Sequence, residues 1–297
     1  MDLVNHLTDR LLFAVPKKGR LYDNCVSLLK GCDIQFNRSN RLDIALSTNL
    51  PIALIFLPAA DIPTFVGEGR CSIGITGVDQ VKESDVDVEL AINLLFGNCK
   101  LQLQVPENGP YIEPEQLIGK TIVSSFVNLT RQYFEKLENK KPGETLKTKI
   151  KFVGGSVEAS CALGVADGIA DLVESGETMR AAGLKSIDTL LTTSAHLIVS
   201  KNASHPELVE IIKSRIQGVM AAQKYVLCNY NAPRANLSRV LEITPGRRAA
   251  TVSPLEDDLW VAVSAMVEKK NIGTVMDKLK DNDASDILVF EISNCRV

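Results

Sequence analysis

Apolar runs and helical spacing alternate along the first third of the chain. The run Leu11–Val15 is typical of a buried strand, and residues 21–32 carry apolar side chains at helical intervals. A strand at Ile52–Pro58, a short helix at Asp61–Gly69 and a strand at Cys71–Gly77 are expected to follow. This order of elements predicts a parallel α/β sheet.

A second α/β unit follows the first. Strands are expected at residues 100–105, 119–126 and 149–155, with a helix from about Asn128 to Leu137. The aliphatic run Ile169–Val173 has the pattern of a further strand, and a polar turn and a short helical pattern come directly after it. The alternation of strands and helices therefore continues through the middle of the chain.

The last 75 or so residues change character. Their pattern predicts a strand, a helix, two strands, a helix and a final strand, which is the βαββαβ order of a ferredoxin-like domain. The strands are expected at residues 225–230, 249–255, 259–267 and 286–292, and the helices at 235–243 and 271–283. A small domain of this kind at the end of an enzyme is often regulatory, although this is an analogy between folds.

Composition and charge narrow the class of protein. Hydrophobic residues make up 45% and charged residues 23% of the chain, as in a soluble globular protein with a sizeable core. The formal net charge of −3 argues against a nucleic-acid partner but leaves small anionic substrates open. The start MDLVNHLTDR lacks the pattern of a signal peptide, and no apolar stretch approaches the length of a membrane span. We expect a cytoplasmic protein without a membrane partner.

Several kinds of chemistry are absent from the sequence. The seven cysteines are scattered, which indicates neither a disulfide framework nor a zinc site, and the three histidines have no metal-ligand spacing. There is no phosphate-binding P-loop, no dinucleotide fingerprint and no nucleophile elbow. No metal ligand is therefore assigned. His196 is expected to be a strand residue, and Asp79 is expected either at the edge of a site or as a helix cap.

The stretch ADGIADLVESGETMRAAGL, residues 166–184, places carboxylates beside a small polar turn. Asp171 lies inside the expected strand, and the Ser-Gly-x-Thr turn follows it. Carboxylates accept hydrogen bonds from sugar hydroxyls, whereas a tight turn at a helix start offers backbone N–H groups to a phosphate. The combination suits a ribose 5-phosphate. An ordinary strand-to-helix connection capped by Ser or Thr explains the spacing about equally well.

Two other segments are candidates for binding an anion. In Gly154–Glu158, Ser156 is the expected N-cap of a helix, and Glu158 in the first turn is explained more simply by the helix dipole. In Lys17–Arg20, three cations follow the first strand, at the edge where open α/β sheets bind ligands. These cations would suit a polyphosphate, and a solvated basic loop is the alternative.

Six segments occur in the order found in ATP phosphoribosyltransferases. They are VPKKGRLYD, DIPTFVGEG, IGITGVDQV, NLTRQYFEK, GGSVEASCALGVADGIADLVESGETMRAAGL and TPGRRAATVSPL. Over essentially its whole length the chain resembles the long form of this family. The resemblance implies an α/β catalytic part with the two-lobed fold of type II periplasmic binding proteins, followed by a ferredoxin-like regulatory domain. It implies a first lobe at 1–95 and 185–212, a second lobe at 96–184 and a histidine-binding domain at 213–297.

The resemblance also implies a reaction. The family catalyses the first step of histidine biosynthesis, in which N1 of the adenine of ATP attacks C1 of phosphoribosyl pyrophosphate and pyrophosphate leaves. Mg²⁺ is the implied cofactor. No covalent intermediate is implied, because the adenine nitrogen is already a nucleophile and pyrophosphate on magnesium is a good leaving group.

The resemblance assigns roles to particular residues. Asp171 and Glu158 match the acidic residues that hold the ribose hydroxyls, and both can stabilise a developing positive charge. Lys18 and Arg20 match basic residues near the pyrophosphate and the phosphates of ATP. The 5-phosphate loop matches Glu174, Ser175, Gly176, Glu177 and Thr178.

The chain departs from the family pattern at two places. The family often has a basic residue just before DIP, whereas this chain reads FLPAADIP, and Lys100 is expected to compensate. The family also usually has Asp in the piece that reads CSIGITG here, where Ser72 stands. Both departures concern the ATP pocket and leave the ribose-phosphate block intact.

Inhibition by L-histidine in the last domain, and by AMP at the active site, is implied as well. Asn231 and Thr251 match the family's effector contacts. Because some members have Asp where Asn231 stands, an ion pair to the effector's amino group would become a plain hydrogen bond. We therefore expect weaker or differently tuned inhibition. The family's assembly implies a homo-oligomer, with dimers that form hexamers.

Three other classes of protein remain as alternatives. A solute-binding protein shares the two-lobed fold but is expected to carry a signal peptide. A different phosphoribosyltransferase shares the phosphate turn but lacks the TPGRRAATVSPL domain. A non-catalytic regulatory protein with the same fold is disfavoured by the intact ESGET turn and Glu158.

Overall fold

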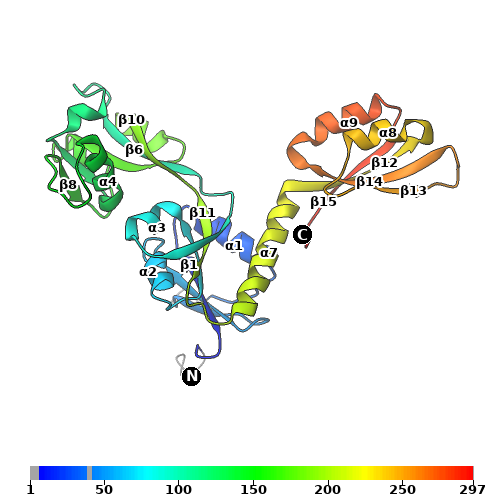
Figure 1. The fold of residues 1–297 in the computed structure, drawn as a ribbon, viewed down its shortest axis with the longest axis horizontal. Coiled ribbons are helices and arrows are strands. Elements are labelled where there is room, and N and C mark those ends of the chain that lie inside the picture. Colours follow the sequence, from blue (N-terminus) through cyan, green and yellow to red (C-terminus); the bar gives the residue numbers. More distant parts are fainter. Residues whose placement is uncertain (1–6, 39–41, 297) are drawn as a thin grey trace. The chain divides into compact units, whose positions relative to one another are not determined.

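The computed structural model describes residues 7–38 and 42–296. Its strands form three β-sheets (Figure 1). The chain divides into two compact units. One unit contains the chain up to Val26 together with Gln35–Val209, and the other contains Ser27–Ile34 and Glu210–Val297.

A six-stranded sheet forms the first lobe of the first unit, in the order β2-β3-β1-β4-β11-β5. β1, β3 and β4 are parallel, and β11 is antiparallel to both β4 and β5. The three parallel strands were predicted from their apolar runs, and their inward side chains are fully buried. The strands are β1 (Leu11–Pro16), β2 (Ile44–Leu46), β3 (Ile52–Leu57), β4 (Ile73–Gly77), β5 (Val88–Asn93) and β11 (Ala195–Ser200).

Three helices occur along this stretch of the sequence: α1 (Tyr22–Gly31), which is divided between the two units, α2 (Ile62–Gly67) and α3 (Val78–Ser84). The predicted short helix at residues 61–69 is therefore confirmed as α2. Gly74 allows α2 to pack closely on β4, because a Cβ atom there would come within 2.7 Å of Ile62 Cγ2 and 2.9 Å of Val66 Cγ2. This close packing fixes the position of β4, and α3 begins at the carboxyl end of this strand.

A five-stranded sheet forms the second lobe, in the order β10-β6-β9-β7-β8. β6 is antiparallel to both β9 and β10, whereas β7 is parallel to β8 and β9. The strands are β6 (Cys99–Pro106), β7 (Thr121–Ser124), β8 (Lys149–Phe152), β9 (Gly168–Val173) and β10 (Leu184–Thr193). The helices are the 3-10 helix η2 (Pro114–Leu117), α4 (Val127–Leu137), α5 (Ala159–Ala162) and α6 (Glu177–Ala181).

Two connections join the lobes. The chain passes to the five-stranded sheet between β5 and β6 and returns between β10 and β11. The connections are paired, because Ala195 donates to the carbonyl of Phe96 (3.0 Å) and Leu94 donates to the carbonyl of Ala195 (2.9 Å). This topology is the type II periplasmic-binding-protein fold that was expected. The return to the first lobe was expected at residue 185, but Leu184–Thr193 form β10, whose pairing with β6 keeps the chain in the second lobe until Thr193.

The last part of the chain is the expected βαββαβ domain. Its sheet has the order β13-β14-β12-β15, and Figure 1 shows α8 and α9 on one face of this sheet. Tyr230, Val240 and Val263 belong to the core between the sheet and the helices. The elements are β12 (Tyr225–Pro233), η3 (Arg234–Asn236), α8 (Leu237–Ile243), β13 (Thr251–Pro254), β14 (Trp260–Glu268), η4 (Lys269–Asn271), α9 (Ile272–Lys280) and β15 (Ser285–Glu291).

A long helix, α7 (Pro206–Lys224), precedes this domain and was not predicted. It runs without a break into β12, so the boundary expected at residues 212 and 213 falls inside the helix. Its buried hydrophobic positions are Leu208, Val209, Ile212, Ile216, Val219 and Ala222. The sequence signal for a boundary was a change of composition, which a continuous helix does not mark.

Within residues 7–38 and 42–296, no helix is long and apolar enough to cross a membrane.

Candidate active site

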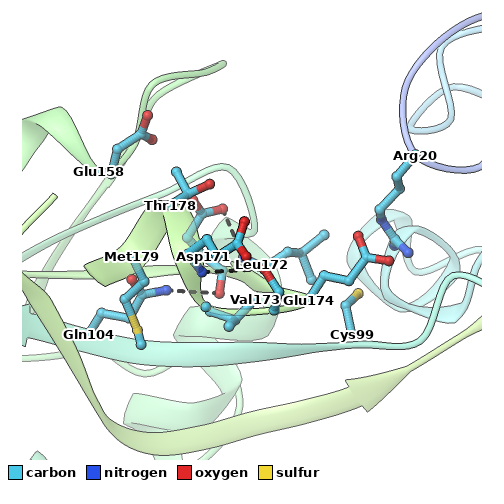
Figure 2. A pocket seen from close by; sticks show the side chains of 13 residues that line it. Arg20, Cys99, Gln104, Glu158, Asp171, Leu172, Val173, Glu174, Thr178 and Met179 are labelled. Carbon is cyan, nitrogen blue, oxygen red and sulfur yellow. Dashed lines mark hydrogen bonds between the residues drawn. The ribbon is translucent and has the colours of Figure 1, made fainter. Parts of the chain in front are cut away.

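A pocket of about 270 Å³ lies at the end of β9. Figure 2 shows Asp171 and Thr178 on one side of Glu174 and Arg20 on the other, with Cys99 next to Glu174. Residues from the second lobe form most of the wall, and Arg20 comes from the first lobe. The wall consists of Arg20, Cys99, Gln104, Glu158, Asp171, Leu172, Val173, Glu174, Ser175, Gly176, Glu177, Thr178 and Met179.

Asp171 lies in β9 with its carboxylate at the pocket. Its Oδ1 accepts a hydrogen bond from the backbone N–H of Leu172 (2.8 Å), and Gln104 Nε2 donates to its backbone carbonyl (3.3 Å). Burial raises the pKa of the Asp171 carboxyl group, and the negative charge of Glu158 raises it further, whereas the Leu172 hydrogen bond opposes the rise. Two acidic side chains thus face one cavity, where they can accept hydrogen bonds from a diol.

Glu158 reaches the pocket by a different local structure from the one expected. Ser156 was predicted to be a helix N-cap, but this prediction is wrong, because α5 begins at Ala159 and the N-cap position is Glu158. Ser156 instead has a φ of 50°, so the backbone turns there before the helix starts. The turn sets Glu158 on the wall that Asp171 also lines (Figure 2).

The polar turn after β9 is held by hydrogen bonds between side chains and its backbone. Gly176, with a φ of 78°, stands at the N-cap position of α6. Arg180 Nη2 donates to the carbonyl of Ser175 (3.3 Å), and the N–H of Glu177 donates to Ser175 Oγ (3.4 Å). Hydroxyls and backbone N–H groups gathered in such a turn suit an anion. The structure brings all five expected loop residues, 174–178, to the same pocket as Asp171 and Glu158.

The three expected cations are placed differently from one another. Arg20 lines the pocket, whereas Lys18 and Lys100 are exposed and lie outside its lining residues. Lys100 is in β6, where it pairs with Val173 and Thr192, and it does not replace a basic residue before DIP in the pocket wall. Among the predicted cations, Arg20 is therefore the one that lines the same pocket as the polar turn.

Another cation lies near the segment that precedes DIP. The Arg38 guanidinium carbon is 3.9 Å from the ring centroid of Phe56, a residue of β3. Arg38 Nη2 and Lys17 Nζ each lie 3.4 Å from a carboxylate oxygen of Asp43. The sequence did not single out Arg38, because a loop residue and a strand residue far apart in the chain show no common pattern.

The second departure from the family pattern lies away from the pocket. Ser72 precedes β4, and its Oγ lies 2.7 Å from Ser204 Oγ and accepts the backbone N–H of Ser204 (3.1 Å). The carboxyl end of β4, in contrast, leads to Asp79, whose carboxylate contacts Arg20 (3.6 Å). Ser72 therefore contributes a buried structural contact at the opposite end of the strand.

Five lining residues were not predicted: Cys99, Gln104, Leu172, Val173 and Met179. Cys99 and Gln104 belong to β6, which the register places beside β9, so that Gln104 pairs with Ile169. Burial raises the pKa of the Cys99 thiol to about 11, with smaller effects from the charges of Arg20, Asp79 and Glu174. The pairing of β6 with β9 brings Cys99 and Gln104 to the pocket, and the sequence carries no signal for this pairing.

The described part of the chain contains no group of three His, Cys, Asp or Glu side chains arranged to hold a metal ion. His196 lies in β11, as expected of a strand residue.

A second pocket, of about 250 Å³, lies on the sheet of the last domain. Asn231 and Thr251, which were expected to contact an effector, both line it. Asn231 Nδ2 donates to Asp286 Oδ2 (3.0 Å), so a carboxylate from β15 stands beside Asn231. Among the described residues, the buried Asn229 Oδ1 has no hydrogen-bond partner, and Asn229 lines the same pocket.

The fold and the first pocket define a two-lobed α/β protein with acidic side chains and a turn of small polar residues in one cavity, followed by a ferredoxin-like domain. Residues 58–218 match the family model described as ATP phosphoribosyltransferase. Residues 222–294 match the model described as HisG, C-terminal domain. The chain belongs to the ATP phosphoribosyltransferase family, whose members are transferases of histidine biosynthesis.

Curated relatives match the whole chain. The ATP phosphoribosyltransferase of Yarrowia lipolytica is 72% identical over 297 residues, and that of Saccharomyces cerevisiae is 68% identical over 298 residues, each with 100% of both chains covered. A solved structure of the ATP phosphoribosyl transferase (HisG:HisZ) complex from Thermotoga maritima has a TM-score of 0.59 and is 24% identical. It covers 70% of this chain and 96% of its own, and it supports the fold.

Proposed function

We propose that the protein transfers the 5-phosphoribosyl group of phosphoribosyl pyrophosphate to N1 of the adenine of ATP. The products are phosphoribosyl-ATP and pyrophosphate, and the reaction is the first step of histidine biosynthesis. The observation that carries the proposal is the shared pocket of Asp171, Glu158 and the turn at residues 174–178. This pocket occurs in a chain whose curated relatives of the same length are ATP phosphoribosyltransferases.

The pocket suggests how the donor binds. Asp171 and Glu158 accept hydrogen bonds from the two ribose hydroxyls, because ionised carboxylates are acceptors only. The 5-phosphate takes the turn at residues 174–178, where Gly176 lets the backbone approach closely. Arg20, on the far side of Glu174, binds the diphosphate end of a substrate.

The chemistry needs no base in the pocket. A bond forms between adenine N1 and C1 of the ribose while the bond from C1 to the diphosphate oxygen breaks, and its electron pair leaves with pyrophosphate. Positive charge develops on the ribose ring during this exchange. Asp171 and Glu158 stabilise that charge as fixed negative groups in a partly buried site, and binding both substrates in one cavity supplies the orientation.

Mg²⁺ is the proposed cofactor. Magnesium sites in proteins commonly use one or two carboxylates, with water and substrate phosphates as the remaining ligands. The pocket fits this pattern, because it offers Asp171 and Glu174 but no three-residue metal cluster among the described residues. When bound, the ion would neutralise charge on the leaving diphosphate.

The second pocket is the proposed site of L-histidine inhibition. Asp286 supplies a carboxylate next to Asn231, so the pocket still offers an acidic partner for the amino group of an amino acid. The Asn229 amide oxygen is a further acceptor. These two acceptors support a site in which Asp286, and not Asn231 alone, contacts the amino group of the effector. AMP as a competitor at the active site, a dimer or hexamer of identical chains, and a cytoplasmic location complete the proposal.

The direct test mixes the purified protein with ATP, phosphoribosyl pyrophosphate and Mg²⁺, and follows phosphoribosyl-ATP by its ultraviolet absorbance. Parallel reactions contain L-histidine, and Asp171→Ala serves as the inactive control. Product that histidine suppresses is the expected result. Product without suppression would remove the regulatory part of the proposal. Binding of both substrates without product would instead indicate a solute-binding or non-catalytic regulatory protein.

A further inference from the structure

Asp79 is a fully buried carboxylate outside the pocket wall, at the start of α3. The sequence left it as a site-edge residue or a helix cap. The N-cap position is Gly77, and the Asp79 side chain makes no capping bond. A buried carboxylate is costly without polar partners, so the partners of Asp79 indicate its role.

The partners of Asp79 come from three parts of the first unit. Oδ1 accepts a hydrogen bond from Thr193 Oγ1 (2.7 Å), and the backbone N–H of Asp79 donates to the same hydroxyl (3.0 Å). Gln80 Nε2 donates to Oδ2 (3.1 Å). Arg20 Nη2 lies 3.6 Å from Oδ1. Thr193 is nearly as buried as Asp79, so these groups form a fixed acceptor behind Arg20.

Arg20 joins this buried group to the pocket. Its side chain is 26% exposed and lines the cavity, and its Nη1 also donates to the carbonyl of Gly97. Gly97 lies in the connection from β5 to β6, and Thr193 ends β10 at the return connection. A guanidinium has five N–H donors, so it can hold Gly97 and Asp79 and still bind a phosphate oxygen.

Two glycines make these contacts possible. A Cβ atom on Gly77 would lie 2.1 Å from Asp79 Oδ1. A Cβ atom on Gly97 would lie 3.0 Å from Arg20 Nη1 and 2.3 Å from Leu21 Cδ2. The side chains of Asp79 and Arg20 occupy space that only glycine leaves open.

We infer that Asp79 is a positioning residue, which together with Thr193 holds the Arg20 guanidinium at the pocket for the diphosphate group of a substrate. The inference rests on the phosphoribosyl transfer proposed above. Asp79 does not touch the substrate in this role. Its effect on the reaction passes through Arg20, and this distinguishes it from a residue that only stabilises the fold.

Thr193→Val and Thr193→Ser form the first test, because valine removes the hydroxyl at nearly constant shape whereas serine keeps it. Thr193→Val should raise KM for one phosphate-bearing substrate about tenfold and change kcat less. This is the size of effect expected when a charge-assisted contact loses its orientation. Thr193→Ser should restore KM. Ser72→Ala is the matched control, because it deletes an equally buried hydroxyl at the other end of β4 and should lower stability alone.

A double-mutant cycle of Asp79→Asn and Arg20→Ala is the second test. Asp79→Asn alone should raise the same KM about tenfold and should weaken the binding of inorganic pyrophosphate measured by calorimetry. In the Arg20→Ala background it should have no further effect. Separate KM values for ATP and for phosphoribosyl pyrophosphate show which diphosphate group Arg20 holds.

Independent effects of the two substitutions would overturn the inference, and so would a Thr193→Val protein with unchanged KM. If Asp79→Asn fails to fold, the Thr193 pair decides the outcome. A wild-type protein without product would refute the proposed function, and pyrophosphate binding by the same variants would still test the positioning of Arg20.

Discussion

The charge of Glu158 acts on Asp171 across the first pocket and raises the pKa of its carboxyl group, in addition to the larger effect of burial. Both side chains line one cavity, although Asp171 belongs to β9 and Glu158 precedes α5. The repulsion between the two carboxylates raises the free energy of the folded protein when no ligand is bound. The arrangement becomes favourable when a ligand supplies hydroxyl donors or positive charge between them.

Glu158→Gln should move the acidic limb of the pH profile to lower pH. Asp171 must be ionised to accept ribose hydroxyls, so kcat/KM falls as the pH decreases through its raised pKa. Removing the Glu158 charge removes one cause of the rise, and the pKa should fall. The profile of kcat/KM for phosphoribosyl pyrophosphate gives the shift. The exposed Glu115→Gln substitution is the control, and an unmoved limb in Glu158→Gln would contradict the coupling.

Asp171→Asn should lower activity while it increases stability at neutral pH. A carboxyl group with a raised pKa in the folded state binds more protons folded than unfolded, so its effect on stability becomes unfavourable as pH rises through that pKa. Asparagine avoids this cost. Urea unfolding should show a larger free energy of unfolding than wild type at pH 7, and the difference should shrink below the pKa of the unfolded carboxyl group. Turnover should fall about 100-fold, the scale of losing one electrostatic contact to the transition state.

Gly176→Ala should raise KM for phosphoribosyl pyrophosphate about tenfold, because the turn must distort (an effect of roughly 1.4 kcal/mol). Gly176 has a φ of 78°, and a Cβ atom there would lie 2.7 Å from Arg180 Nη1. Gly183→Ala is the matched control, with a φ of 67° and no heavy atom within 4 Å of the new Cβ. Both substitutions strain the backbone, and only the first should alter KM. Equal KM values for the two variants would count against a 5-phosphate site in this turn.

Tyr230→Phe should destabilise the last domain by about 1 kcal/mol, the usual net value of a buried hydrogen bond. The Tyr230 hydroxyl lies 2.7 Å from Thr244 Oγ1, and both side chains are buried. Thr244 Oγ1 also donates to the carbonyl of Val240 (3.0 Å), so it keeps one partner. Denaturant unfolding of Tyr230→Phe, Thr244→Val and the double variant measures the coupling. Additive losses would show that the pair has no mutual interaction.

Asp286→Asn should raise the inhibition constant of L-histidine about tenfold or more, because the second pocket loses its carboxylate beside Asn231 (a charged hydrogen bond is worth roughly 1.5–3 kcal/mol). Asn231→Asp tests the other half of the proposal, since it places a second carboxylate next to the first. Initial rates at several histidine concentrations give both constants. Unchanged inhibition in both variants would exclude this pocket as the effector site, and unchanged KM values for the substrates would show that the catalytic pocket is intact.

The order of elements followed from the sequence because it depends on local periodicity. Apolar runs such as Leu11–Val15 and Ile52–Pro58 are short and end at proline or polar residues, which favours buried strands over helices. The βαββαβ pattern of the last domain likewise needs no long-range information. Helix α7 was missed although its buried positions Val209, Ile212, Ile216 and Val219 recur at helical intervals, so this element was within reach of the same periodicity argument.

Most of the predicted residues of the first pocket likewise belong to one contiguous segment of the sequence. Asp171 and residues 174–178 are neighbours in the chain, so the strand and the turn bring them together in any fold that contains both. Tertiary structure alone decided which other residues share the cavity. The register of β6 against β9 adds Cys99 and Gln104, and the buried contacts of Asp79 with Thr193 and Arg20 select one cation of three. Local periodicity fixes strands and turns over a few residues, whereas strand register and buried charge pairing depend on contacts between residues roughly 60 to 120 positions apart.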